Sequence, residues 1–409
     1  MPMPLANKLE ILADAAKYDA SCASSGAAPR RASPGGIGST QRMGICHSYA
    51  PDGRCISLLK LLLTNACSFD CLYCVNRRSS NVPRARFRAE EVVRLTLAFY
   101  RRNCIEGLFL SSGILRGPDD TMAQMAQVAR MLREQHGFRG YIHLKAVPGA
   151  SADALAEAGQ FADRLSINVE LPTAAGLCRL APEKDAASIH ATMAAMRARI
   201  DASRAEPAVT RFAPAGQSTQ MIIGADGTDD RTILAASSRL YDRFRLRRVY
   251  YTAFSPIPDA SALLPLQAAP LLREHRLYQA DWLLRFYGFA TAEITENGNG
   301  MLDLDIDPKL AWALRHRGQF PVDVNRADRA LLLRVPGLGK RTVERIIAMR
   351  RVRAVRLEDL QRLRVPLRTV RAFVLAAGAS GVPRGLEDAN LRAHLAPRPQ
   401  QLQLFPSSR

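Results

Sequence analysis

Three cysteines in this sequence have a spacing that suits metal chemistry. Cys67, Cys71 and Cys74 lie within the run TNACSFDCLYCVN. Thiolates at i, i+4 and i+7 can converge on one small metal cluster, and thiolate-rich sites select iron–sulfur clusters or zinc. Structural zinc requires a fourth ligand, and neither a Cys nor a His follows close behind. Three ligands on a four-iron cube would instead leave one iron open to a chelating small molecule.

Three further cysteines precede this run. Cys22, Cys46 and Cys55 occur upstream, with His47 beside the second of them. They are either ordinary buried or solvated thiols, or the ligands of a second metal site that His47 or Cys104 completes. Their spacing fits no standard metal motif.

The chain around the cysteine loop has the pattern of a parallel α/β fold. The apolar run from Leu58 to Leu63 predicts a buried strand that delivers the loop. Short apolar strands then alternate with helical stretches, which indicates a parallel barrel or doubly wound sheet. We predict strands at 58–63, 107–111, 140–146, 164–169, 218–223 and 247–253, and helices near 89–102, 119–136, 151–160, 185–204, 229–243 and 267–287.

The cysteine loop resembles a known family. CSFDCLYC is similar to the C-x3-C-x-aromatic-C signature of radical S-adenosylmethionine (SAM) enzymes, with Tyr73 in the aromatic position. The resemblance implies a 4Fe–4S cluster on Cys67, Cys71 and Cys74, whose open iron binds the amino and carboxylate groups of SAM. One-electron reduction then yields a 5′-deoxyadenosyl radical. The six predicted units match the partial (β/α)6 barrel of this family.

Polar residues follow several predicted strands, where a parallel barrel binds its ligands. Ser112 and Gly113 resemble the family's glycine-containing segment that meets the methionine amino group, and Lys145 could face the SAM carboxylate. Ser166 and Asn168 share one face of the fourth strand with Glu170. Ile223-Gly224 resembles the family's adenine-contacting segment. Each could also be a polar strand end without a role. The sequence identifies no further catalytic residue.

An arginine-rich stretch follows the cysteine loop. Within twelve positions it holds Arg77, Arg78, Arg84, Arg86 and Arg88. Such a charge run is either a solvated loop or, because guanidinium groups match phosphate geometry, a contact to a nucleic-acid backbone.

The positive charge of the chain is concentrated at one end. The formal net charge is +19, and residues 309–409 alone hold 21 Lys and Arg against 7 Asp and Glu. A basic module of this kind is typical of nucleic-acid binding. No apolar run is long enough to span a bilayer, and eight cysteines with a thiolate cluster fit a reducing cytoplasm.

Residues 321–375 resemble a helix-hairpin-helix DNA-binding motif. Asn325 or Asp328 can cap its first helix, and Gly337 and Gly339 permit positive φ and a close backbone approach. The second helix would then offer amides to phosphate, beside Lys340 and Arg341. Arg334-Val335-Pro336 recurs as Arg364-Val365-Pro366, which suggests a second, degenerate copy. A helical protein-binding module is the alternative.

The last residues resemble a partner-binding peptide. Gln401, Leu402, Leu404 and Phe405 fit, with one departure at Gln403, the peptide by which bacterial replication and repair proteins bind the DNA sliding clamp. The proline-rich tail before it is predicted to be extended.

Taken in order, these features divide the chain. We expect an N-terminal extension (1–57), a partial barrel (58–290), a connector (291–320), a helix-hairpin-helix domain (321–380) and a tail (381–409). This order resembles the putative DNA modification/repair radical SAM proteins, a family associated with a uracil-DNA-glycosylase-like partner. The resemblance implies a radical enzyme acting on DNA with a one-electron reductant. A radical SAM enzyme for tRNA and an iron–sulfur DNA-binding redox protein that does not cleave SAM remain alternatives.

Overall fold

The computed structural model describes residues 3–16, 45–49, 55–206, 211–296, 298–378 and 386–396. The chain forms two compact units. The first comprises Met1–Thr228 with Ala236–Pro270, and the second comprises Asp229–Ala235 with Leu271–Arg409. None of the helices in the described ranges is long and apolar enough to cross a membrane.

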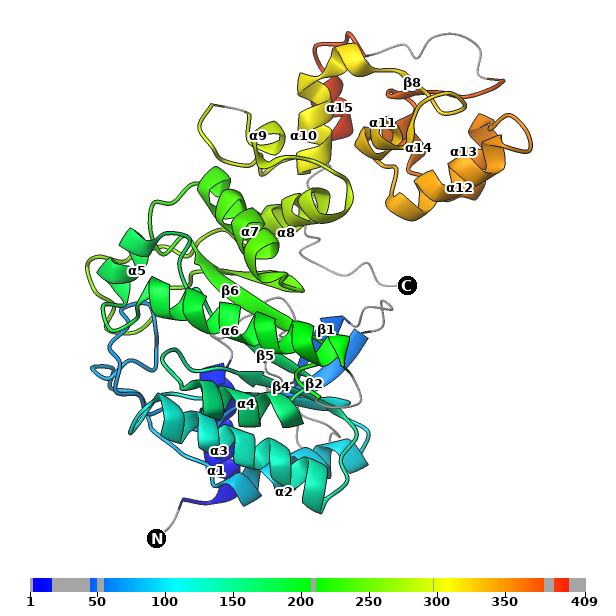
Figure 1. The fold of residues 1–409 in the computed structure, drawn as a ribbon. Helices are drawn as coiled ribbons and strands as arrows, with labels where there is room; N and C mark the ends of the chain where they lie inside the picture. Colours follow the sequence, from blue (N-terminus) through cyan, green and yellow to red (C-terminus); the bar gives the residue numbers. More distant parts are fainter. Residues whose placement is uncertain are drawn as a thin grey trace, which may run out of the picture. The chain divides into compact units, whose positions relative to one another are not determined.

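A seven-stranded sheet is the centre of the first unit (Figure 1). Strands β2 to β7 are parallel and adjacent in chain order, and β1 pairs antiparallel with β2 at the edge. The strands are β1 (Ile45–Tyr49), β2 (Cys55–Leu62), β3 (Gly107–Ser111), β4 (Tyr141–Lys145), β5 (Arg164–Ser166), β6 (Gln217–Ile223) and β7 (Arg248–Ala253). Because consecutive parallel strands are joined by helices, their carboxyl ends all meet at one edge of the sheet.

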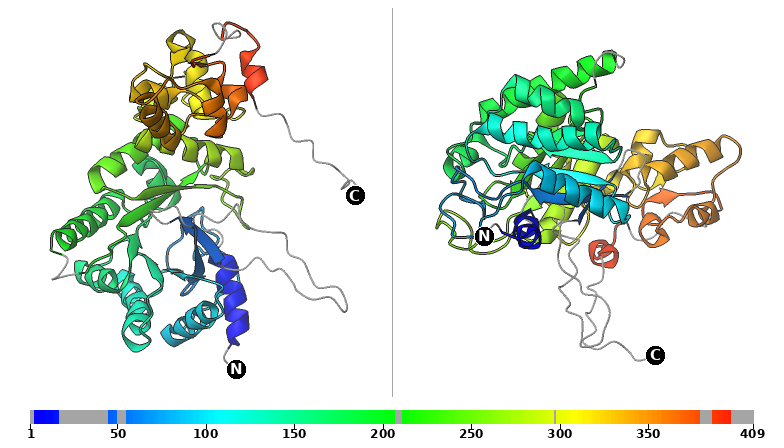
Figure 2. Two further views of the ribbon diagram at one scale, coloured as in Figure 1. Left: turned by 90° about the vertical axis from the view of Figure 1, so that its right-hand side faces the viewer. Right: turned by 90° about the horizontal axis from the view of Figure 1, so that it is seen from below.

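The long helices that join consecutive strands lie on the convex face of the curved sheet, as Figure 2 shows. Leu61, Leu110 and Leu144, on the face that these helices cover, are fully buried. The helices before and between the strands are α1 (Leu5–Ala16), α2 (Ala89–Arg101), α3 (Pro118–Arg130) with the π-helical turn η1 (Met131–Gln135), α4 (Ala152–Phe161), α5 (Ala174–Leu180), α6 (Ala186–Ala205) and α7 (Asp230–Phe244), whose first residues belong to the second unit. Their apolar stripes supply the other half of the core.

The predicted partial barrel is confirmed, with six parallel strands in the expected order and positions. Two elements were not predicted. Strand β1 lies in the N-terminal extension. Its sequence, ICHSY, lacks the alternation of apolar and polar residues that predicts a strand. Helix α5 is only seven residues long, too short for a periodic pattern.

The second unit is mainly helical. Its elements are α8 (Leu271–Phe286), α9 (Thr291–Ile294), α10 (Pro308–Arg315), η2 (Arg317–Gln319), β8 (Val322–Asp323), α11 (Arg329–Arg334), α12 (Lys340–Arg350), α13 (Leu357–Arg362), α14 (Leu367–Val370), β9 (Val374–Leu375) and α15 (Leu391–Leu395). The sequence pattern predicts α8 as a helix of the barrel, but α8 belongs to the second unit. Polar contacts hold it there, because the Arg276 guanidinium donates to the Leu304 carbonyl and Arg273 pairs with Asp230.

Helices α11 to α14 form two helix pairs that pack on each other. The turn of the first pair contains Gly337 at φ +83°. A Cβ built there would lie 2.7 Å from Val370 Cγ2 and 2.9 Å from Pro366 Cγ, both in the second pair. The sequence repeat therefore corresponds to two helix pairs in direct contact, and β8 and β9 at their ends pair in parallel.

A buried lysine supports the turn of the first helix pair. Lys309 Nζ donates to the Leu338 carbonyl oxygen at 2.6 Å and lies 4.7 Å from the ring centre of Tyr287. Burial lowers the pKa of Lys309 to about 7, although the nearby Asp307 carboxylate opposes the shift. The turn is therefore fixed by a cation whose desolvation is costly.

This lysine gives the second unit a pH dependence. Between pH 7 and 10 the unfolded chain holds the Lys309 proton more tightly than the folded one, so the free energy of unfolding should rise with pH. Urea unfolding followed by tryptophan fluorescence can measure this, since both tryptophans, Trp282 and Trp312, lie in this unit. Lys309→Met should flatten the rise, whereas Lys340→Met, at an exposed lysine, should keep it. Equal slopes in both variants would contradict this account.

Candidate functional site

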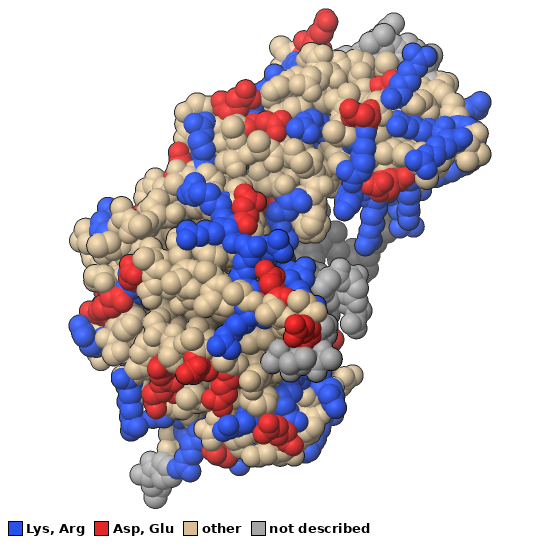
Figure 3. All heavy atoms as spheres, viewed as in Figure 1, with Lys and Arg blue, Asp and Glu red and all other residues tan. Residues whose placement is uncertain are grey.

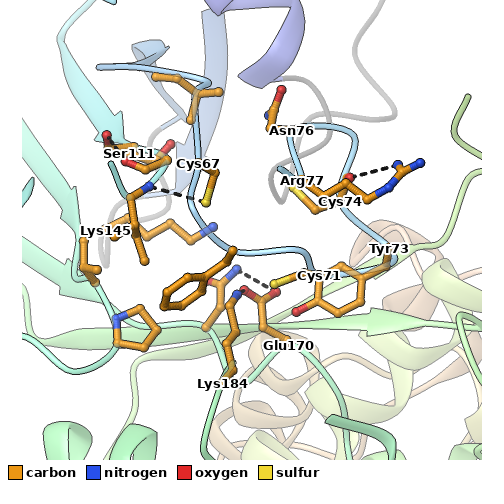
Figure 4. Close-up of a pocket in the computed structure, with 18 of the residues that line it drawn as sticks. Cys67, Cys71, Tyr73, Cys74, Asn76, Arg77, Ser111, Lys145, Glu170 and Lys184 are labelled. Carbon is orange, nitrogen blue, oxygen red and sulfur yellow. Dashed lines mark hydrogen bonds and ion pairs between the residues drawn. The ribbon is translucent and has the colours of Figure 1, made fainter. Parts of the chain in front are cut away.

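A cavity of the first unit opens at the carboxyl ends of the parallel strands, and the three cysteines of the loop line it (Figure 4). Its empty volume, with the open mouth included, is about 1050 Å³. Successive strands each contribute a residue from at or just beyond their carboxyl ends, namely Leu62, Ser111, Lys145, Asn168 and Ile222. The cavity therefore occupies the position where parallel barrels bind their ligands.

The segment after β3 fastens the start of the cysteine loop. Gly113 N donates to the Thr64 carbonyl at 2.7 Å, and Ser68 N donates to the Ile114 carbonyl at 2.6 Å. Ile114 N lies 3.5 Å from Cys67 Sγ and donates to it. A Cβ at position 113 would clash with the Ala66 carbonyl, so the close approach of the two segments requires glycine there.

Two arginines of the predicted nucleic-acid run hold the far side of the loop instead of facing solvent. The Arg84 guanidinium donates to four backbone carbonyls, those of Asn65, Asn76, Arg77 and Ser80, at 2.6 to 2.9 Å. Arg77 is buried and donates to the carbonyls of Cys74, Pro258 and Asp259. Through these contacts both arginines support the backbone of the cysteine loop. Arg78, Arg86 and Arg88 remain exposed.

We expect Arg84→Met to impair metal binding by the loop. The substitution removes the donors of four carbonyls, and each charge-assisted bond contributes about 1.5–3 kcal/mol. Iron content per chain after anaerobic reconstitution should fall several-fold. Arg86→Met is the matched control, since Arg86 is exposed and reaches only the Gln124 side chain. Equal iron content in both variants would refute the structural role of Arg84.

The cavity is a poor environment for an uncompensated thiolate. Burial raises the pKa of the Cys71 thiol to about 12 and also raises the pKa of Cys74. The Lys184 ammonium acts in the opposite direction on both, but burial dominates. Since a thiolate is the form that binds metal, a bound metal has to supply the missing stabilisation.

A buried ion pair lies opposite the cysteines. Lys184 Nζ and Glu170 Oε1 are 2.5 Å apart, and Figure 4 shows both side chains on the cavity wall near Cys71. Burial alone would lower the pKa of Lys184, but Glu170, Tyr73 and Cys71 together outweigh burial and the pKa is raised. Asn168 Nδ2 donates to Glu170 Oε2 at 3.3 Å and to Gln220 Oε1 at 3.0 Å. Glu170 itself has φ +64°, a strained conformation for a non-glycine residue.

Two buried hydroxyls of the cavity wall have no hydrogen-bond partner among the residues that the structure describes. They are Tyr73 OH and Ser111 Oγ. Buried polar groups without partners are uncommon and are frequently completed by a ligand or ion. Tyr73 belongs to the cysteine loop and Ser111 ends β3, so the donor set and the orphaned hydroxyls fit a polar cofactor in this cavity.

Among the described residues, no group of three or more His, Cys, Asp or Glu side chains is close enough to hold one metal ion, and this includes the cysteine loop. Each thiolate of a four-iron cluster binds a different iron atom, so its sulfur ligands stand further apart than ligands of one ion.

Most of the predicted cofactor residues line the cavity. They are Tyr73, Ser112, Gly113, Lys145 and Asn168. Ser166 does not line it, because its hydroxyl is hydrogen-bonded to His143 Nε2 at 2.9 Å inside the barrel. Gly224, at φ +79°, also lies outside the wall, where Ile222 takes its place.

Sequence reasoning did not single out Lys184, Gln220 or Ala15 of α1, which also line the cavity. Nothing in the local sequence of Lys184 distinguishes it from a surface lysine.

The predicted second metal site is not assembled within the described residues. Cys46 is buried against Leu58 and Phe109, an apolar environment, and Cys104 is exposed. Cys22 lies outside the described residues, and the side chains of His47 and Cys55 are not described. The second site therefore stays a prediction.

The second unit carries a basic surface over α12 to α14, where Lys and Arg side chains gather in Figure 3. The exposed members are Lys340, Arg341, Arg345, Arg351, Arg353, Arg356, Arg362, Arg364, Arg368 and Arg371. Lys340 and Arg341 of this surface are the first residues of α12, whose N-cap is Gly339 at φ −87° with no side chain to cap it. The amide of Lys340 donates to Tyr287 OH at 3.2 Å.

The two capping candidates have different roles. Asp328 caps α11, accepting a hydrogen bond from Leu331 N at 2.7 Å. Asn325 instead exchanges two hydrogen bonds with the backbone of Val355 and thereby joins the two helix pairs.

Comparisons with known proteins find similarity in structure only. No protein-family model matches the chain, and no curated protein does. Among solved structures, the chain is similar to the FeFe-hydrogenase maturase HydG from Carboxydothermus hydrogenoformans (15% identity, 55% of this chain and 50% of that chain, TM-score 0.44). It is also similar to SuiB from Streptococcus suis (10%, 56% and 47%, 0.39) and to a radical SAM methyltransferase from Sphaerobacter thermophilus (14%, 62% and 73%, 0.40).

The matched segment spans about half the length of the first of these chains. Similarity this low carries no inference about reaction or substrate, so the function has to be argued from the residues of the two units themselves.

Proposed function

We propose that this protein is a radical SAM enzyme that holds a 4Fe–4S cluster on Cys67, Cys71 and Cys74 and acts on nucleic acid. The observation that carries the proposal is the position of the cysteine loop: all three cysteines line one cavity at the carboxyl edge of a parallel sheet. The cluster and SAM together would supply a 5′-deoxyadenosyl radical able to abstract a hydrogen atom.

The residues of the cavity have distinct proposed tasks. Arg84 and Gly113 fix the path of the cysteine loop. Ser112, Gly113 and Lys145 would receive the amino and carboxylate groups of SAM, and Tyr73 OH and Ser111 Oγ would gain the partners that they lack. Asn168 Nδ2 already donates to Gln220 and Glu170, so its Oδ1 would accept a hydrogen bond from a sugar hydroxyl.

The nucleic-acid part of the proposal is supported by the second unit. The exposed Lys340 and Arg341 lie at the start of α12, where a helix N-terminus favours an anion. A contact of this kind reads the backbone and not the sequence. A base within a duplex is shielded from a radical held in a barrel, so the reaction would require an extruded base or a single strand. DNA is the proposed substrate.

Anaerobic reconstitution with iron, sulfide, SAM and a reductant tests this function. Release of 5′-deoxyadenosine separates a radical SAM enzyme from an iron–sulfur protein that only transfers electrons. Deuterated DNA and deuterated tRNA, supplied in parallel, then identify the substrate by transfer of deuterium into 5′-deoxyadenosine. No 5′-deoxyadenosine with an intact cluster would contradict the proposal.

Further partners remain proposals from the sequence. The clamp-binding peptide at Gln401, Leu402, Leu404 and Phe405 lies outside the described residues. A glycosylase-like partner follows only from the family resemblance.

A further inference from the structure

A large aromatic side chain of the second unit is exposed. Trp282 on α8 has 52% of its surface accessible, although large aromatic side chains are usually mostly buried. It packs against Phe286 with ring centres 4.4 Å apart and an interplanar angle of 54°. The guanidinium of Arg285 lies 4.8 Å from the centre of the Phe286 ring. We call Trp282, Arg285 and Phe286 the α8 platform.

The exposure of Trp282 follows from the geometry of the helix. Leu277, Ala280 and Leu283 on the opposite side of α8 are buried and anchor it to the second unit. At 3.6 residues per turn, Trp282 and Phe286 fall on the side that points away from this buried face. The i, i+4 spacing of Trp282 and Phe286 on one helix is enough to explain the contact between their rings. It does not explain why the indole of Trp282 stays half exposed.

We propose that the α8 platform stacks an unpaired base of nucleic acid. Flat aromatic rings with an adjacent guanidinium are what proteins use to stack bases of single strands. The charge of this unit is complementary to a polyanion, because the basic surface over α12 to α14 belongs to it. This inference rests on the proposed function and adds to it that the second unit holds unpaired bases.

The platform and the candidate phosphate site are held together by Tyr287. This residue directly follows Phe286, and its hydroxyl accepts the hydrogen bond of the Lys340 amide at 3.2 Å. The platform and the start of α12 therefore both adjoin the end of α8. An unpaired base is free to stack on the platform, whereas the bases of a duplex are already stacked on one another. The arrangement therefore favours a single strand or an extruded base.

The two tryptophans make the inference measurable in the full-length protein. Trp312 is buried between the rings of Phe289 and His316, so binding at the surface should alter only the fluorescence of Trp282. Binding is followed by the anisotropy of a labelled thymidine oligomer of about 12 nucleotides, and in parallel by tryptophan quenching. A duplex of the same length is the second ligand.

The expected result has three parts. The oligomer quenches the fluorescence of the wild-type protein. Trp282→Phe abolishes the quenching but keeps the affinity, because phenylalanine also stacks. Trp282→Ala weakens binding of the single strand roughly 5- to 150-fold and weakens binding of the duplex much less. Rescue by phenylalanine separates stacking from a general loss of structure, and urea unfolding of the Ala variant checks its fold.

Other outcomes overturn the inference in distinguishable ways. If Trp282→Ala binds the single strand with unchanged affinity, or if binding does not quench the wild-type fluorescence, the base-stacking role of the α8 platform is refuted. The proposed function is not affected by either result. Failure of acrylamide to quench Trp282 in the free protein would mean that protein already covers this face, so that it is not a nucleic-acid site. Failure of the wild-type protein to bind either ligand would refute the nucleic-acid function as well.

Discussion

Replacing Cys67, Cys71 or Cys74 singly by Ala should abolish the visible absorbance of the reconstituted cluster and all cleavage of SAM. Each thiolate would bind a different iron, and two thiolates are too few to hold a four-iron cube in a cavity that otherwise disfavours charged sulfur. Iron content, the absorption spectrum and release of 5′-deoxyadenosine measure the loss. We expect each of the three readouts to fall to background.

Cys178→Ala is the matched control. Cys178 is exposed and does not line the cavity, so cluster content and SAM cleavage should stay at the wild-type level. An intact four-iron cluster in any of the three loop variants would overturn the ligand assignment. The same measurement tests the upstream cysteines: a second cluster requires about eight iron atoms per chain in place of about four.

The parallel sheet was predictable because its signal is local. Most strands from β2 to β7 are short, largely apolar segments, and each is bounded by a helical stretch or polar loop. In such a pattern the right-handed crossover rule leaves few arrangements, so strand order and the edge that carries the site follow from the sequence. The cysteine spacing then identified the loop, since the ligands lie close together in the chain.

The rest of the site depends on contacts that a sequence does not encode locally. Lys184 reaches Glu170 from the segment after α5, and that contact forms only when the loop folds over the cavity. Arg84 belongs to a charge run that reads as a nucleic-acid contact, yet its guanidinium is enclosed by backbone carbonyls of the cysteine loop. A run of charged residues in the sequence does not show where each side chain points. Buried and exposed arginines within such a run are therefore distinguished only in the folded structure.

The two glycines of the first helix pair illustrate the same limit. The sequence predicts the same role for Gly337 and Gly339, because either glycine gives the backbone of the turn more conformational freedom. In the structure Gly337 has a positive φ and is packed against the second helix pair, whereas Gly339 has an ordinary φ and its nearest neighbour for a Cβ is Tyr287 OH at 3.8 Å. One glycine is required for folding, and the other lies at the candidate phosphate site.

Gly337→Ala should therefore destabilise the second unit strongly. The left-handed conformation costs a non-glycine residue about 1–3 kcal/mol, and the new Cβ would press on Val370 and Pro366, which adds an overpacking cost of similar size. Urea unfolding followed by tryptophan fluorescence should show a loss of about 2–5 kcal/mol in the free energy of unfolding. Cluster content should not change, because the cysteine loop belongs to the first unit.

Gly339→Ala is the matched variant and should separate folding from binding. Its Cβ would meet no crowded atom, so we expect a change in the free energy of unfolding of less than about 1 kcal/mol. If a phosphate approaches the first amides of α12, the added methyl group should still weaken binding of nucleic acid. Neutralising Lys340 and Arg341 should then lower the log–log salt slope by about one unit for each lost phosphate contact. Unchanged affinity in Gly339→Ala together with an unchanged salt slope would exclude the start of α12 as a phosphate site and favour a protein-binding role for the helix pairs.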